Sequence, residues 1–154
     1  MKRFLIVLFA LMIIAAQSFA SSPADKYVEE HNFCCHAAGA TKITGEPEID
    51  DNRYTYHAAD GVDVIFTIKD NELTTFTCVC LKDEQIGEFL AQCVTAFYNM
   101  GGLMAYTYCH DPLLTDFLQA RAGTDAEKDT TIPGLIFGVQ KKSFGYVFIL
   151  VKVK

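Results

Sequence analysis

Residues 53–81 read RYTYHAADGVDVIFTIKDNELTTFTCVCL, and apolar and polar side chains alternate along most of this stretch. Alternation with a period of two is typical of β-strands that bury one face. Two short segments interrupt the pattern, Ala59-Asp60-Gly61 and Asp70-Asn71, and turns of this composition join antiparallel neighbours. We therefore predict a three-stranded meander with strands over 53–57, 62–69 and 72–81.

The side chains of these strands indicate which face of the meander is buried. The second strand places four apolar residues on one face, which we predict to be the core face: Val62, Val64, Phe66 and Ile68. On the third strand one face carries Phe76, Cys78 and Cys80, and the other carries Leu73, Val79 and Leu81. We predict that the face with the phenylalanine and the cysteines is buried.

Helical periodicity is found on both sides of the meander. Ser22-Pro23 predicts a helix start, the apolar positions from Ala24 to Ala38 recur every three or four residues, and Gly39 predicts the end. After the meander, Asp83 predicts a helix cap, and the helix should end near Gly101-Gly102. Asp111-Pro112 predicts a further helix through Arg121, whereas residues 103–110 fit either a helix or a strand.

Two strand-like runs, 134–140 and 144–154, predict a C-terminal hairpin. The grouped elements predict an α+β fold: an antiparallel sheet of about five strands, formed by the meander and the hairpin, with two or three helices packed on one face. We expect residues 21–154 to form a single globular domain. The element order resembles that of small bacterial domains with the secretion-chaperone-like fold, which begin with a helix, a three-strand meander and another helix. This resemblance implies a fold and no function.

The first twenty residues have the pattern of a signal peptide. Lys2 and Arg3 precede an apolar run from Phe4 to Ala16, and Ser18-Phe19-Ala20 places small residues at a cleavage position. We predict cleavage after Ala20 and a secreted or periplasmic protein. No second apolar run reaches the about 20 residues that a membrane span needs, so we expect no span after cleavage.

Charge argues against one class of partner. Without Lys2 and Arg3 the chain has 11 basic and 19 acidic residues, a formal charge of −8. Such a chain repels phosphate backbones, so we predict no nucleic-acid binding. The acidic stretch 46–51, EPEIDD, lacks the spacing of a calcium loop, and we predict a solvated loop there.

Six cysteines lie in the predicted mature chain: Cys34, Cys35, Cys78, Cys80, Cys93 and Cys109. An even number of cysteines in an exported protein predicts disulfides. The predicted faces bring Cys93 toward Cys78 or Cys80, and a second bridge would join Cys34 or Cys35 to Cys109. Six cysteines allow 15 complete pairings, so these pairings remain open.

The same cysteines support two alternative functions. His31, Cys34 and Cys35 share one face of the first predicted helix, so a zinc or copper site is the first alternative, with the pair Cys78 and Cys80 as additional ligands. A thiol-dependent enzyme is the second, and it needs a thiolate activated by a histidine. The chain has no G-x-S-x-G, phosphate-loop or dinucleotide motif, so we assign no catalytic residue and no cofactor.

Aromatic residues alternate along several predicted strands. Tyr54, Tyr56, Tyr146 and Phe148 either form a solvent-facing binding surface or cover a buried sheet face. If these residues form a solvent-facing surface, the sequence favours a non-catalytic binding or protein-interaction module whose partner is a protein, a peptide or a glycan.

Overall fold

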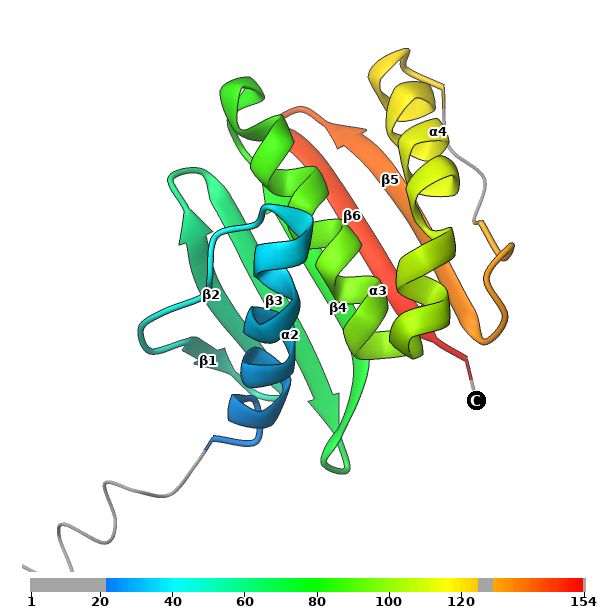
Figure 1. Cartoon of the computed structure of the whole chain (residues 1–154). Coiled ribbons are helices and arrows are strands. Elements are labelled where there is room, and N and C mark those ends of the chain that lie inside the picture. Colours follow the sequence, from blue (N-terminus) through cyan, green and yellow to red (C-terminus); the bar gives the residue numbers. More distant parts are fainter. Residues whose placement is uncertain (1–21, 125–128, 154) are drawn as a thin grey trace, which may run out of the picture.

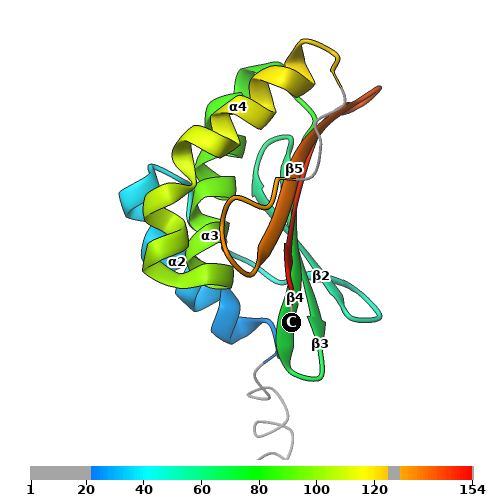
Figure 2. The same cartoon turned by 90° about the vertical axis from the view of Figure 1, so that its right-hand side faces the viewer.

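The computed structural model describes residues 22–124 and 129–153, so the predicted signal peptide lies outside the described residues. Three helices lie on one face of an antiparallel sheet, as Figures 1 and 2 show from the front and along its edge. The helices are α2 (Asp25–Ala38), α3 (Ile86–Tyr108), which follows the short 3-10 helix η1 (Asp83–Gln85), and α4 (His110–Arg121). The predicted α+β class is confirmed.

The sheet has six strands in the order β1-β2-β3-β4-β6-β5. They are β1 (Glu48–Asp50), β2 (Arg53–Ala59), β3 (Val62–Lys69), β4 (Glu72–Cys80), β5 (Leu135–Lys142) and β6 (Gly145–Lys152). The predicted meander is β2 to β4, and the predicted hairpin is β5 and β6. The last strand, β6, pairs with β4, so β5 becomes an edge strand beside α4.

Two sequence predictions about the strands need correction. The stretch 46–51 contains the short edge strand β1, whose three residues are all exposed; backbone pairing alone forms it, so no alternation of buried residues marks it. Leu73 is buried, although the alternation placed it on the outer face of β4. A register shift between Thr67 and Ile68 pairs Leu73 with Ile68, which faces the core, and so places Leu73 on the core face as well.

The helix boundaries follow local chemistry. The Ser22 backbone N–H donates to the Asp25 carboxylate, and the Ser22 hydroxyl accepts from the Ala24 N–H, so this start resembles a capping box. Gly39 ends α2 with φ 72°. Asp83 does not cap α3 through its side chain, contrary to the prediction.

Gly102 interrupts α3 with φ 70° and ψ −165°, at the pair where the sequence predicts an end. Residues 103–108 then continue as a second helical segment, which settles the ambiguity between helix and strand. Cys109 keeps a helical backbone conformation and leads directly into α4. The predicted start, with Asp111 as the cap and Pro112 as the first helical residue, is therefore two residues late.

Aromatic rings fill the core between the helices and the sheet. Phe97 of α3 meets Phe137 of β5 edge-to-face at 4.9 Å and Phe148 of β6 at 5.7 Å, and all three are almost inaccessible to solvent. Burial of this apolar surface is the main force that holds α3 on the sheet. No helix among the described residues is long and apolar enough to cross a membrane.

Candidate functional site

The predicted aromatic binding face lies in the core instead of at the surface. Tyr56, Tyr146 and Phe148 are buried, and Tyr54 is half-buried against the same cluster. Their strands turn these side chains toward the helices, so the alternation marks the covered face of the sheet. The binding-face interpretation of these four residues is therefore wrong.

His31 is completely buried between α2 and the sheet. Its ring stacks on Phe76 at 5.5 Å and meets the edge of Phe66 at 5.7 Å. Its Nε2 donates to Gln92 Oε1 at 2.6 Å, because the Gln92 amide nitrogen donates to Thr41 O and to Glu88. Burial lowers the pKa of His31 to about 4, so the ring is neutral at pH 7.

The residues of the metal alternative are not assembled as a ligand set. His31 Nε2 is already engaged by Gln92, and the Cys35 thiol faces Asn32 Oδ1 at 3.9 Å. Within the described part of the chain, no group of three or more histidine, cysteine or acidic side chains could hold a metal ion. Cys78 and Cys80 lie on β4, within the hydrophobic core cluster.

All six cysteines are buried free thiols in this structure. Cys80 donates to Lys82 O at 3.1 Å and Cys109 to Tyr106 O at 3.2 Å, so both thiols have partners on their own segments. Cys93 differs, because it is completely buried between α3 and β4, and Cys78, Cys80 and Cys109 are close enough to contribute to its raised pKa. Burial raises the pKa of Cys93 well above the ordinary thiol value, and it also raises those of Cys34, Cys35, Cys80 and Cys109.

Several large apolar side chains are exposed on the second helical segment and α4. Five large side chains there are at least half exposed and recur at helical spacing; we call them the apolar ridge: Leu103, Met104, Tyr108, Leu114 and Leu118. The inward positions Leu113 and Phe117 pack in the core. The predicted apolar content of α4 is therefore divided between the core and the surface.

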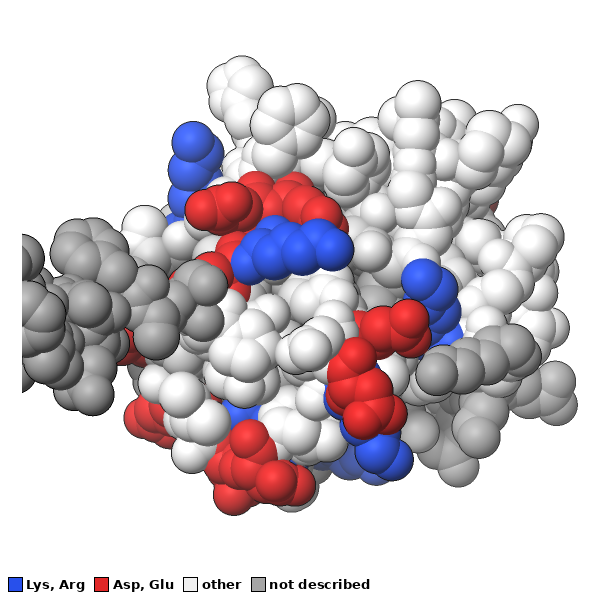
Figure 3. Space-filling view, turned by 90° about the horizontal axis from the view of Figure 1, so that it is seen from below, with Lys and Arg blue, Asp and Glu red and all other residues white. Residues whose placement is uncertain are grey.

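Few charged residues lie near the apolar ridge in the sequence. Between Glu88 and Arg121 the acidic residues are Asp111 and Asp116, there is no lysine or arginine, and Asp116 is buried. Figure 3 views the molecule from below with the helices uppermost, and its upper right part is almost free of charged side chains. Phe33 of α2, which is 80% exposed, lies on the same helical side. The scarcity of charged residues between Glu88 and Arg121 was the feature of the sequence that could have indicated this surface.

The opposite face of the sheet is also uncovered by the described residues, and it mixes threonines with aliphatic side chains. Thr55, Ile65, Thr77 and Ile149 lie in register across four strands. Next to them, His57 Nδ1 lies 2.6 Å from Asp63 and Nε2 lies 3.7 Å from Glu48. The hydrogen bond to Asp63 and the charges of both carboxylates raise the pKa of His57.

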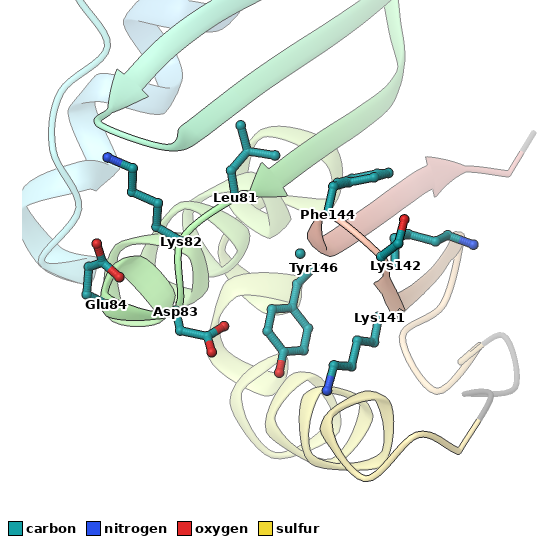
Figure 4. A pocket seen from close by; sticks show the side chains of 10 residues that line it. Leu81, Lys82, Asp83, Glu84, Lys141, Lys142, Phe144 and Tyr146 are labelled. Atoms are coloured by element: carbon teal, nitrogen blue, oxygen red, sulfur yellow. The ribbon is translucent and has the colours of Figure 1, made fainter.

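A hollow of about 440 Å³ lies between the β4–η1 connection, 81–84, and the β5–β6 hairpin, 141–146. Leu81 and Phe144 form an apolar wall (Figure 4). Asp83 and Lys141 lie on opposite sides of the Tyr146 ring, whereas Lys82 and Lys142 point away from it. Lys82 instead pairs with Asp60.

Tyr146 forms the base of this hollow. It is 4% exposed, and its ring packs against Phe117 at 5.1 Å and Phe89 at 6.4 Å. Gly145 lets the hairpin approach β4 closely, since a Cβ there would lie 1.9 Å from Cys80 O at a φ of 143°. The strand end at Cys80 therefore fixes the position of the hairpin.

Comparison of the chain with known protein families, with curated proteins and with solved structures finds no match.

Proposed function

We propose that this protein is an exported, non-catalytic interaction module that binds a protein partner through the apolar ridge. The ridge carries the proposal, because large exposed apolar side chains on one side of a folded domain mark interaction surfaces. Leucine, methionine and tyrosine with few charges match the centre of a protein interface. The partner surface should likewise be largely apolar, since Asp111 is the one exposed acidic side chain among the described residues along the ridge and no lysine or arginine lies there.

The open face of the sheet supports the ridge as the binding surface. On that face Ile65 is 8% exposed and Ile149 is 39% exposed, whereas each of the five ridge side chains is at least half exposed. The exposed polar residues along the ridge are Thr107, His110, Asp111 and Thr115. Contact with a partner would therefore remove more apolar surface from water per side chain at the ridge.

We also propose export with cleavage after Ala20, based on the charged start, the apolar run and the small residues described above. The acidic composition of residues 21–154 suits a protein outside the cytoplasm as well as one inside it, so the N-terminal segment alone carries this proposal. Mass spectrometry of the protein recovered from culture medium or periplasm should give an N-terminus at Ser21. An intact Met1 in the cell-associated protein would contradict it.

In an oxidising compartment we propose Cys78–Cys93 as the first disulfide. Both side chains are completely buried in the same core cluster, and Cys78 is the cysteine that contributes most to the raised pKa of Cys93. Two thiols would exchange with a disulfide oxidant, which is reduced to two thiols as the Cys78–Cys93 bond forms. Non-reducing peptide mapping should find this linkage, and six free thiols in the exported protein would contradict it.

The raised thiol pKa values weaken the thiol-enzyme alternative. A nucleophilic cysteine needs a lowered pKa, and each resolved shift here is upward because burial disfavours the thiolate. His31 also donates its Nε2 proton to Gln92, so that nitrogen does not act as a base. The geometry therefore favours cysteines as structural residues.

The native size of the protein tests the interaction surface. In its own compartment the protein should elute in gel filtration above the size of a monomer, as a complex with its partner. Leu103→Glu combined with Leu118→Glu should return it to monomer size, whereas Ile149→Glu on the open sheet face should not. A monomeric native protein, or equal effects of the two sets of substitutions, would contradict the proposal.

A further inference from the structure

The hollow beside Tyr146 contains charged groups that do not neutralise each other. In the described residues, Asp83 and Lys141 form no salt bridge, although both line the same 440 Å³ space. Figure 4 shows them on opposite sides of the Tyr146 ring. A positive and a negative group are therefore held apart, facing solvent, at one concave site.

Tyr146 adds a polar atom to this site. The residue is 4% exposed, but its hydroxyl is not one of the buried polar atoms that lack a partner among the described residues, so the hydroxyl is the part that reaches the solvent in the hollow. Phe89 and Phe117 pack against the ring. In Figure 4 the hydroxyl end of Tyr146 lies between the Asp83 and Lys141 side chains.

The remaining wall of the hollow is apolar. Leu81 and Phe144 are both about half exposed, and they lie above Tyr146 in Figure 4. The volume falls in the range of small-molecule sites, which combine apolar walls with a few placed polar groups. A ligand that fits has two opposite charges at its ends and an apolar body between or beside them.

We propose that this hollow binds a small zwitterion, such as an amino acid, with its ammonium group at Asp83 and its carboxylate at Lys141. The Tyr146 hydroxyl donates a hydrogen bond to the same carboxylate. The ligand body covers Leu81 and Phe144. Ion pairs at such exposed sites are weak, so we expect a dissociation constant of about 1–10 mM at low salt.

Amide NMR titration of the purified, processed protein tests this site with α,ω-amino acids of increasing length, from glycine to 6-aminohexanoate. Saturable shifts should appear at 82–84 and 141–146, with one chain length preferred. Pentanoate and butylammonium, which each carry one charge, should bind at least fivefold more weakly. Equal binding of pentanoate would show a simple anion site and overturn the proposal, as would shifts that do not saturate.

Two matched substitutions separate this geometry from general charge effects. Lys141→Gln and Lys142→Gln remove the same charge from neighbouring residues, but only Lys141 lies beside Tyr146. Lys141→Gln should weaken zwitterion binding at least fivefold and Lys142→Gln less than twofold. Asp83→Asn and Tyr146→Phe should also weaken it, with unchanged core amide shifts as evidence of folding. Equal effects of the two lysine substitutions would overturn the proposal.

Discussion

The helices α2 and α4 cover the same face of the sheet on either side of α3, but different forces hold them (Figure 1). Polar contacts fix α2: Asn32 exchanges two hydrogen bonds with Ile43, and Gln92 of α3 joins His31 to Thr41. Asn99 of α3 also donates to Tyr27 O at 3.0 Å. These contacts define the position of α2 against α3.

The contacts of α4 are mainly apolar on its inner side. Leu113, Phe117 and Ala120 are buried, and the inward-facing acid, Asp116, leaves its Oδ2 without a hydrogen-bond partner in the described residues. The outer side of α4 carries part of the apolar ridge. Directional polar contacts therefore specify one helix, whereas the other has apolar surface on both sides and a buried acid that destabilises it. This difference suits α4 to recognition and α2 to structural support.

The largest expected effect is acid destabilisation through His31. The pKa of His31 is about 4 in the folded protein, whereas the ordinary value of 6.5 applies to the unfolded chain. The unfolded chain therefore binds the proton more tightly. Stability should therefore fall between pH 6.5 and pH 4, by about 3 kcal/mol for this group. Urea unfolding across this range measures it. His31→Gln should remove most of this pH dependence, and an unchanged slope would contradict the assignment.

Removal of Gln92 breaks the link between the two helices directly. Gln92→Leu keeps the size of the side chain but leaves the His31 N–H and Thr41 O without their partner. Loss of these buried hydrogen bonds should cost about 2–3 kcal/mol in the free energy of unfolding. Gln119→Leu on the exposed side of α4 is the matched control and should change it by less than about 0.5 kcal/mol. Similar losses in both variants would show that the network contributes little.

Asp116 should have the opposite pH dependence to His31. Burial, and then the charge of Asp129, raise its pKa from 3.8 to about 6, so the folded protein binds this proton more tightly. Asp116 therefore destabilises the fold as pH rises from about 4 to above 6. Asp116→Asn should stabilise the protein by about 1 kcal/mol at pH 7.5 and by almost nothing at pH 3.5. Asp111→Asn, an exposed control on the same helix, should have no such pH-dependent effect.

The smallest effect on stability should come from the apolar ridge. Leu118→Ala should change the free energy of unfolding by less than about 0.5 kcal/mol, because the side chain is half exposed. Leu113→Ala on the inner side of α4 should cost about 2–4 kcal/mol. Thermal unfolding of both variants makes the comparison. A large decrease in the free energy of unfolding for Leu118→Ala would show that the ridge contributes to the stability of the fold.

The sequence predicts the strands well because their alternation is a local property. Val62, Val64, Phe66 and Ile68 are buried as predicted, and the turns at Gly61 and Asn71 join antiparallel neighbours. Leu73 was misplaced because a register shift depends on the neighbouring strand, which the pattern of one strand cannot show. The edge strand β1 was missed because all of its side chains are exposed.

The candidate surfaces were harder to predict. Tyr56 and Tyr146 alternate in the same way whether their face is solvated or covered, and only the position of the helices distinguishes the two cases. Leu114 and Leu118 directly follow the buried Leu113 and Phe117 in the sequence, so apolar character alone does not separate core from surface positions on α4. The hollow beside Tyr146 depends on the pairing of β6 with β4, which brings two distant segments together.

Site-specific photo-crosslinking in producing cells compares the two helices most directly. A photoreactive amino acid placed at Leu118 on the ridge, or at Glu29 on the exposed side of α2, reports which helix touches a partner. The account predicts one discrete crosslinked protein from position 118 and none from position 29. No crosslink from 118, or the same crosslinked species from both positions, would contradict the apolar ridge as the binding surface.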